Sequence, residues 1–192
     1  ISNEVIIEQL KVLLERYKFD AVKIGLIPSL SLLEQVIPMI RENVKNNVVV
    51  WDPVLSASAG FDFDHELSQL ENVLELVDWM TPNWEEIKRL SGCSDSLEGA
   101  KKLSAKTKVY LKGGHNELDK GKDYLFEGDD VQSFNPRTGM FFEKHGSGCV
   151  FSSALTANIA KGYPKQKAVL RAKRYVEHFL KGNSSKLGRH YG

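Results

Sequence analysis

The feature that most constrains the fold of this chain is a regular alternation of short apolar runs with longer segments of helical periodicity. The apolar runs lie at residues 21–27, 48–51, 78–81 and 108–112, and each is short enough to be a strand. Segments with apolar residues three and four positions apart separate them, as in amphipathic helices. Strands that alternate with helices build a mostly parallel sheet covered by helices on both faces. The sequence therefore predicts an α/β protein.

The rest of the chain extends this prediction. Helices are predicted at residues 6–14, 31–41, 66–77, 83–90, 97–105, 149–161 and 165–180, and Pro38 is expected to interrupt the second of them. A hairpin is predicted from Asp123 to Phe134, around the turn at residues 127–130. We expect one domain over residues 1–182, followed by a frayed polar tail over residues 183–192.

Composition and charge argue against several classes of function. The 192 residues carry 26 basic and 25 acidic side chains, and a net charge of +1 gives no electrostatic attraction to nucleic acid or an anionic membrane. No stretch approaches the roughly 18 apolar residues that span a bilayer. The two cysteines, Cys93 and Cys149, are too few for a disulfide framework, so we expect free thiols and a cytoplasmic location.

Polar residues follow three of the predicted strands directly. Asp52 comes after one strand, Asn83 and Glu86 after the next, and Lys112 with Gly113 and Gly114 after the last parallel strand. In such folds ligands bind at the carboxyl ends of the strands. We therefore expect these residues to converge at one edge of the sheet.

The sharpest motif is the glycine turn Gly146-Ser147-Gly148, which opens the predicted helix at Cys149. Two glycines let the backbone approach a phosphate closely, and a helix N-terminus offers unpaired N–H groups and positive charge. A helix N-terminus also lowers a thiol pKa, which would suit Cys149 to act as a base in phosphoryl transfer to an alcohol. The alternative is a plain glycine-rich loop with a buried structural cysteine.

The other strand-end residues also have two interpretations. Asp52, Asn83 and Glu86 offer the oxygen ligands that Mg²⁺ prefers. Alternatively, Asn83 caps a helix with Glu86 completing a capping box, and Asp52 is a turn residue before Pro53. Lys112 is suited to binding phosphate oxygens, or else it reaches solvent from the end of its strand.

Taken in order, these motifs resemble the hydroxymethylpyrimidine/phosphomethylpyrimidine kinases of thiamine biosynthesis, which belong to the ribokinase superfamily. The matching segments are Ala21 to Ile27 (AVKIGLI), Asp52 to Leu55 with Ser58 to Gly60, Thr81 to Glu86 (TPNWEE), Lys112 to His115 (KGGH), His145 to Cys149 (HGSGC) and Ala172 to Val176 (AKRYV). The resemblance extends from Asp20 to Leu180, and the order of the motifs makes it specific.

The resemblance implies a ribokinase-like fold and a kinase that uses ATP and Mg²⁺ on a flat heteroaromatic alcohol and its monophosphate. It also implies a homodimer. The roles that it implies are a base at Cys149, charge stabilisation by Gly146, Ser147 and Gly148, nucleotide binding by Lys112 and Gly114, Mg-ATP binding by Asn83 and Glu86 with Asp52 assisting, and a ring-pocket contact from Val54.

The chain departs from the family pattern at its start. Family members open with a strand and a GxDxSGGAGxxAD segment, and no counterpart precedes Ile1. We therefore expect a longer native protein, no N-terminal strands of the family's sheet in this chain, and an open sheet edge near Val22 to Leu26 or Val48 to Trp51. Two alternative functions remain: a pyridoxal kinase with the same cysteine, and a non-catalytic ligand-binding relative.

Overall fold

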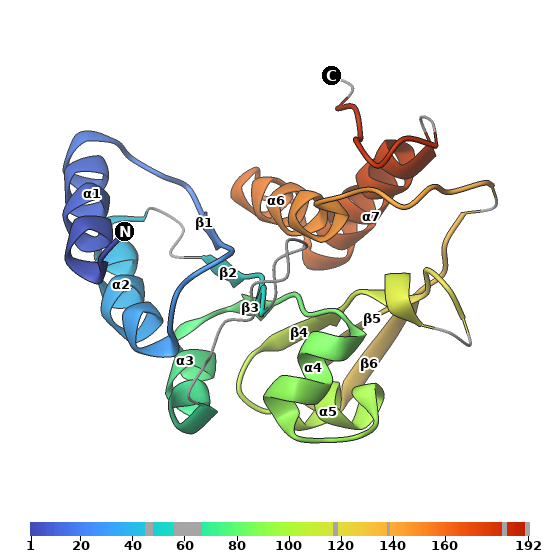
Figure 1. Cartoon of the computed structure of the whole chain (residues 1–192), viewed down its shortest axis with the longest axis horizontal. Coiled ribbons are helices and arrows are strands. Elements are labelled where there is room, and N and C mark those ends of the chain that lie inside the picture. Colours follow the sequence, from blue (N-terminus) through green and yellow to red (C-terminus); the bar gives the residue numbers. More distant parts are fainter. Residues whose placement is uncertain (45–47, 56–66, 117–118, 138, 182–183, 191–192) are drawn as a thin grey trace.

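The computed structural model describes residues 1–44, 48–55, 67–116, 119–137, 139–181 and 184–190. Within them, six strands form a sheet in the order β1-β2-β3-β4-β5-β6, with helices on both faces (Figure 1). The strands are β1 (Val22–Ile24), β2 (Val49–Trp51), β3 (Trp79–Met80), β4 (Lys108–Leu111), β5 (Asp123–Glu127) and β6 (Asp130–Phe134). The helices are α1 (Asn3–Arg16), α2 (Leu30–Asn43), α3 (Leu70–Leu76), α4 (Trp84–Ser91), α5 (Ser96–Leu103), α6 (Ser147–Ala160) and α7 (Lys165–Lys181), with 3-10 turns η1 (Leu67–Gln69) and η2 (Gly113–His115).

The sheet is parallel through its first four strands and antiparallel at its far side. Strands β1 to β4 pair in parallel, whereas β5 runs antiparallel to both β4 and β6. Each apolar run predicted as a strand contains one of these strands in shortened form, and the predicted hairpin is β5–β6. The predicted α/β architecture is therefore confirmed.

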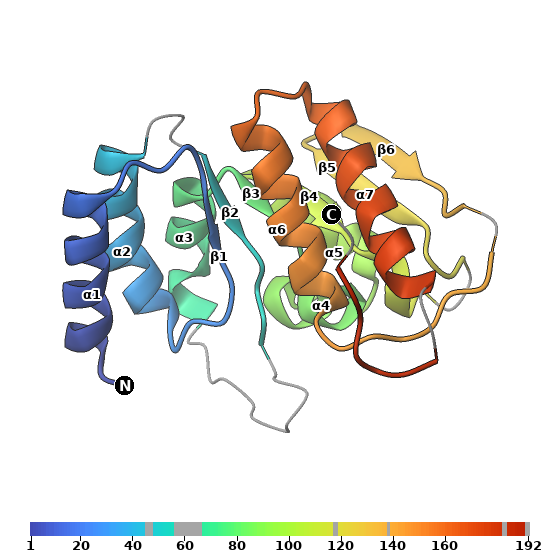
Figure 2. The ribbon, with the colours of Figure 1, turned by 90° about the horizontal axis from the view of Figure 1, so that it is seen from above.

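The strands are apolar on both sides because each face of the sheet carries its own core. Val49 and Trp51 pack into a core shared with α2, α3, α4 and α5, whereas Val50 between them packs with α6 and α7. Figure 2 shows α6 and α7 lying side by side over that second face. Side chains alternate across a strand, so a strand covered on both faces needs an uninterrupted apolar run.

The prediction that Pro38 interrupts its helix is wrong, because α2 continues through it. An interior proline removes one backbone hydrogen bond and costs about 3 kcal/mol or more. Six apolar side chains of α2 are buried: Leu30, Leu32, Leu33, Val36, Ile37 and Ile40. Each contributes about 1.5–3 kcal/mol on burial, so packing outweighs the proline penalty.

Strand β1 lies at the edge of the sheet as described, with β2 as its neighbour. The strand β2, by contrast, is paired on both sides. Just beyond β1, the side chain of Leu26 is 57% exposed. The predicted open edge is therefore at Val22 to Leu26 and not at β2.

Residues 184–190, which belong to the predicted frayed tail, contact other parts of the chain. Within residues 184–190, Lys186 accepts a backbone hydrogen bond from His145 at 2.9 Å, and the His190 ring lies 5.1 Å from that of Phe179. Gly188 lies so close to the Phe179 ring that it has no room for a side chain. This segment therefore packs back onto α7 and is not frayed. No described helix is both long and apolar enough to cross a membrane.

Candidate active site

Backbone pairing brings the predicted strand-end residues to one edge of the sheet. The Asp52 N–H donates to the carbonyl of Ile24 at 2.8 Å, and the Lys112 N–H donates to that of Pro82 at 2.9 Å. Asn83 and Lys112 also form a parallel bridge beyond the ends of β3 and β4. Because four parallel strands end here, residues far apart in sequence become neighbours, as predicted.

Asp52 is the centre of this cluster and is fully buried. Its Oδ1 accepts from the Nζ of Lys112 at 2.7 Å and from the hydroxyl of Thr81 at 3.3 Å. Its Oδ2 accepts from the hydroxyl of Ser152 at 3.0 Å and lies 3.5 Å from the Nζ of Lys23. Burial alone would raise the pKa of Asp52, but the two ammonium groups hold it below its ordinary value.

Three members of the cluster were missed in the sequence: Lys23, Thr81 and Ser152. Thr81 ends the predicted strand and begins the TPNWEE motif, but no role was assigned to it. Ser152 lies one helical turn after Gly148 and hydrogen-bonds to its carbonyl at 3.1 Å, a spacing that could have suggested it. Lys23 is a charged residue within an otherwise apolar strand, and this could have indicated a functional role for a buried lysine.

Lys112 connects the strand edge to the glycine turn. Its Nζ lies 3.9 Å from Oε2 of Glu86. A side chain at Gly148 would place Cβ only 3.0 Å from the same Nζ, so glycine leaves room for the ammonium beside the turn. Burial lowers the pKa of Lys112, but the carboxylates of Asp52 and Glu86 outweigh this effect and raise it. Lys112 therefore stays positively charged at a position suited to phosphate.

The glycine turn adopts the geometry of an anion-binding loop. Gly146 is the N-cap of α6, with a φ of 75°, a left-handed conformation that glycine adopts without strain. No side chain caps the helix at this position. The first-turn N–H groups have no acceptors within an α-helix, so here they are directed outward at the positive end of the helix dipole. Together with Lys112, they suit a phosphoryl group.

Cys149 is exposed in the first turn of α6, so it is not a buried structural cysteine. The prediction that its pKa is lowered is wrong. Loss of water around the thiol raises the pKa, and the negative charge of Asp52 raises it further. The opposing charges of Lys23 and Lys112 do not offset these effects. The thiol is therefore mostly protonated near neutral pH.

Asn83 and Glu86 form the helix cap that was the alternative interpretation. The Oδ1 of Asn83 accepts from the N–H groups of Glu85 and Glu86 at 2.9 and 2.8 Å, and Oε2 of Glu86 accepts from the Asn83 N–H at 2.6 Å. This capping box begins α4. Burial raises the pKa of Glu86 even though Lys112 is nearby, so this carboxylate gains from an additional cation.

These hydrogen bonds leave Glu86 as the best placed of the three residues that were predicted to bind Mg²⁺. Both oxygens of Asp52 are engaged and Oδ1 of Asn83 is used by the cap, so these two residues would contribute to Mg²⁺ binding largely through water, and their role stays a prediction. No group of three or more acidic, histidine or cysteine side chains able to hold a metal occurs in the part of the chain that is described. Glu86 fits a Mg²⁺ ion that keeps most of its water and also binds phosphate, because such an ion needs few protein ligands.

Two predicted residues have weaker structural support. The Val54 N–H bonds back to the carbonyl of Asp52 at 2.8 Å, so its half-buried side chain is held next to the cluster. Nothing lies within 4 Å of where a side chain at Gly114 would be, so no close contact here requires glycine. The Ser58 to Gly60 motif lies outside the described residues. The roles of Val54 and Gly114 stay predictions.

A second buried polar cluster supports the lysine loop from behind. Lys173 of α7 donates to Oδ2 of Asp123 at 2.7 Å and to the carbonyl of Gly121 at 2.6 Å. The Tyr110 hydroxyl bonds the same Oδ2 at 2.7 Å, and Oδ1 accepts from the N–H of Gly113 at 2.6 Å. Asp123 therefore links α7 and β4 to the residue that follows Lys112.

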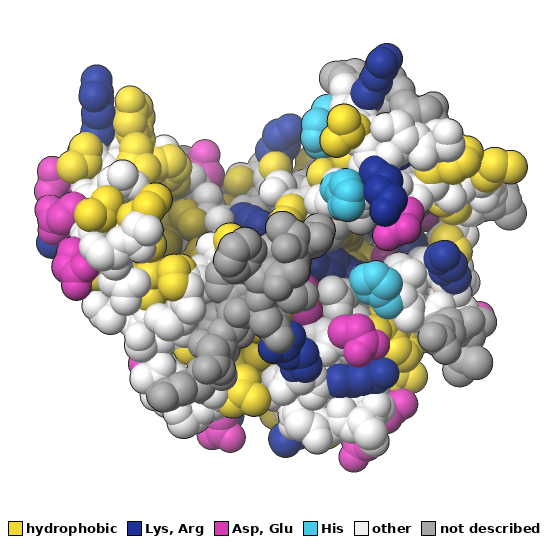
Figure 3. Space-filling view, viewed as in Figure 1, with side chains coloured by type: hydrophobic (Ala, Val, Ile, Leu, Met, Phe, Trp, Pro, Cys, Tyr) yellow, Lys and Arg dark blue, Asp and Glu magenta, His cyan; other side chains and the backbone are white. Residues whose placement is uncertain are grey.

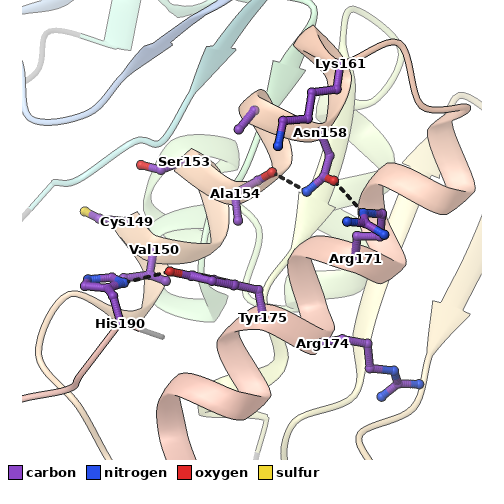
Figure 4. A pocket seen from close by; sticks show the side chains of 11 residues that line it. Cys149, Val150, Ser153, Ala154, Asn158, Lys161, Arg171, Arg174, Tyr175 and His190 are labelled. Carbon is purple, nitrogen blue, oxygen red and sulfur yellow. Dashed lines mark hydrogen bonds between the residues drawn. The ribbon is translucent and has the colours of Figure 1, made fainter. Parts of the chain in front are cut away.

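An open groove of about 910 Å³ begins at Cys149 and runs along α6 and α7 (Figure 4). Figure 3 shows the face between the α1–α2 lobe and the α6–α7 lobe hollowed out, with basic side chains in and beside the hollow. The residues that line the groove are Cys149, Val150, Ser153, Ala154, Ala157, Asn158, Lys161, Arg171, Arg174, Tyr175 and His190. Cys149 is thus accessible from an open space.

Comparison with known proteins supports the motif-based prediction. The family model described as phosphomethylpyrimidine kinase matches residues 1–192, the whole chain. The hydroxymethylpyrimidine/phosphomethylpyrimidine kinase of Aquifex aeolicus is 32% identical over 206 residues, which cover 100% of this chain and 78% of that protein. The pyridoxine kinase of Bacillus subtilis is 30% identical over 193 residues, covering 94% and 71%.

A solved structure agrees with these sequence matches. The Bacillus subtilis pyridoxal kinase in its ADP complex superposes with a TM-score of 0.75 at 28% identity, covering 91% of this chain and 69% of that one. The fold is therefore ribokinase-like, as the resemblance implied. Because the family model matches residues 1–192, the chain belongs to the phosphomethylpyrimidine kinase family.

Proposed function

We propose that this protein is an ATP-dependent kinase that phosphorylates hydroxymethylpyrimidine and then its monophosphate, in thiamine biosynthesis. The observation that carries the proposal is the meeting of Lys112, an uncapped glycine turn and an exposed Cys149 around buried Asp52. Family membership and the Aquifex aeolicus relative support the substrate, and the ADP complex of the Bacillus subtilis structure supports the nucleotide.

The proposed chemistry is in-line transfer of the γ-phosphoryl group of ATP to the acceptor oxygen. Lys112 and the N–H groups of Gly146 to Cys149 neutralise the charge that develops on the transferred phosphoryl oxygens. These donors are held in place by the strand end and the helix start, so they need no rearrangement during the reaction. The glycine turn thus supplies positioning and charge rather than a covalent group.

Cys149 is the better of the two candidate bases for the alcohol. The carboxylate of Asp52 is fully buried, has both oxygens engaged and has a lowered pKa, so it can neither reach nor hold the proton well. The thiol of Cys149 is exposed and has a raised pKa, so its small thiolate fraction is a stronger base. In the second transfer the acceptor is a phosphate, and no proton needs to be removed.

Glu86 is the residue that we assign to Mg²⁺, largely through water and with Asn83 positioning it. When bound, the ion would neutralise part of the negative charge on the phosphate oxygens. Lys112 lies 3.9 Å from Glu86, so the same side of Asp52 carries both the metal-facing carboxylate and the phosphate-binding ammonium. This side is where we place the nucleotide.

A pyridoxal or pyridoxine kinase is the second candidate function. The specific observation in its favour is the similarity to the Bacillus subtilis pyridoxine kinase and to the pyridoxal kinase structure from the same organism. The third possibility, a non-catalytic relative, conflicts with the assembled Lys112, Glu86 and Cys149. Homodimer formation also stays a prediction, which light scattering on the purified protein tests.

A side-by-side assay of the intact protein decides between these functions. ADP release with ATP and Mg²⁺ is measured with hydroxymethylpyrimidine, its monophosphate and pyridoxal as separate acceptors. We expect a higher kcat/KM for both pyrimidines than for pyridoxal. A preference for pyridoxal would establish the second candidate, and no turnover with any acceptor would favour the non-catalytic relative.

A further inference from the structure

Lys23 is a charged residue in the middle of a strand that packs beneath a helix. In β1, Val22 and Ile24 face the core of α2 to α5, so Lys23 between them faces the α6 side of the sheet. Its side chain is only 18% exposed. An apolar residue would satisfy packing at this position, so the ammonium group calls for a chemical explanation.

The ammonium of Lys23 is directed toward the reactive edge of the sheet. A side chain at Gly25 would place Cβ only 2.5 Å from the Lys23 Nζ, so glycine leaves room for the lysine to extend along its own strand. The Nζ thereby comes within 3.5 Å of Oδ2 of Asp52. Its positive charge also lowers the pKa of the Cys149 thiol, so the ammonium acts on the proposed base.

Two lysines therefore flank one buried carboxylate on opposite oxygens. Lys112 is held at 2.7 Å from Oδ1, whereas Lys23 is at the longer distance of 3.5 Å from Oδ2. Lys112 has a second carboxylate nearby in Glu86, and Lys23 has no second acidic partner among the described residues. The charge on the Lys23 side of Asp52 is therefore only partly balanced and suits an incoming anion.

The arrangement gives Asp52 one side for ATP, the phosphoryl donor, and another side for the phosphoryl acceptor. Glu86 and Lys112 mark the nucleotide side of Asp52, and Cys149 marks the point where the acceptor oxygen reacts. Lys23 contacts the other oxygen of Asp52 from the one that Lys112 binds, so we assign its side of the carboxylate to the acceptor. A neutral alcohol has little need of an ammonium there, whereas a phosphomonoester brings negative charge that must be balanced against that of ATP.

We propose that Lys23 binds the phosphate of a phosphomonoester acceptor and so determines how well the second phosphoryl transfer proceeds. This inference rests on the proposed function. In that transfer an oxygen of the acceptor phosphate forms a bond to the γ-phosphorus of ATP. The bond from that phosphorus to the bridging oxygen of ADP breaks, its electron pair leaves with ADP, and no proton is transferred.

The test compares the two transfers in the intact protein carrying Lys23→Met. For hydroxymethylpyrimidine monophosphate we expect kcat/KM to fall about ten- to a hundredfold, mainly through a higher KM, as for loss of a charged hydrogen bond. For the neutral alcohol we expect a smaller fall, because Lys23 also lowers the pKa of the Cys149 thiol, and this smaller fall should shrink as the pH rises. Lys23→Arg keeps the charge and should recover part of the loss. Lys11→Met, at an exposed pair on α1, is the matched control and should change neither transfer.

The outcomes distinguish this inference from the proposed function. Equal losses for both acceptors, or a larger loss for the alcohol, would overturn the role of Lys23 and leave the kinase proposal intact. Wild-type protein that phosphorylates neither pyrimidine would refute the kinase proposal and this inference with it. If Lys23→Met does not fold, Lys23→Gln, which keeps a donor without the charge, is judged by the same ratio of the two transfers.

Discussion

Replacing Cys149 with alanine is expected to separate the two phosphoryl transfers. Only the alcohol must lose a proton as it attacks, and a positioned base contributes about 10²–10⁴-fold to such a step. We therefore expect the rate with hydroxymethylpyrimidine to fall by about that factor. The rate with the monophosphate should change less than about threefold, because Lys112 and the N–H groups of the turn remain.

The raised pKa of Cys149 determines the pH dependence of this effect. An ordinary thiol has a pKa of about 8.5, so only about 3 in 100 thiols are ionised at pH 7. Burial and Asp52 raise the pKa further, so the thiolate fraction is smaller and keeps rising beyond the usual thiol range. The wild-type alcohol rate should therefore rise nearly tenfold per pH unit through pH 7–8, and Cys149→Ala should abolish the rise.

The assay follows each half-reaction separately by chromatography of the products, from pH 6 to 10. Cys93→Ala is the matched control, because Cys93 is the other free cysteine and takes no part in the site. Two results would refute the reasoning. One is an equal fall of both transfers in Cys149→Ala, and the other is a wild-type alcohol rate that reaches its plateau below pH 8.

Three further substitutions test the supporting structure. Glu86→Gln keeps the capping interaction but loses the negative charge. We therefore expect kcat to fall and the Mg²⁺ concentration required for activity to rise, while the melting temperature stays within about 2 °C. An unchanged Mg²⁺ dependence would mean that Glu86 acts only as a helix cap. Lys173→Met leaves Asp123 buried without its ion pair and should lower the free energy of unfolding by about 3–5 kcal/mol. The control Lys101→Met removes an exposed ion pair and should lower it by at most about 1 kcal/mol. Denaturant titration measures both free energies, and equal losses would contradict the argument. Gly113→Ala would place Cβ 1.9 Å from the Lys122 carbonyl oxygen and should lower both stability and kcat/KM, whereas Gly114→Ala has open space around it and should fold normally. Thermal unfolding of the two variants checks this. A stable, fully active Gly113→Ala would show that the loop after Lys112 can shift freely.

The local elements were predictable because their causes are local. Short apolar runs between amphipathic segments indicated the parallel strands, and the turn at residues 127–130 indicated the hairpin. The Asn83 and Glu86 spacing already contained the capping box, which the structure shows. Pro38 misled because a propensity rule considers one hydrogen bond, whereas the buried face of α2 outweighs it.

The sequence by itself determined the α/β fold, the family and the residues at the strand ends, because parallel strands always direct their carboxyl ends to one edge. Only the tertiary structure decided how those residues divide their roles. It brought Lys23 and Ser152 into contact with Asp52 and engaged both oxygens of that carboxylate. It also raised the pKa of Cys149, first through burial of the thiol and then through the charge of Asp52. Helix position alone predicted the opposite shift for Cys149. Burial and neighbouring charge depend on residues distant in sequence, and those are brought together only when the chain folds.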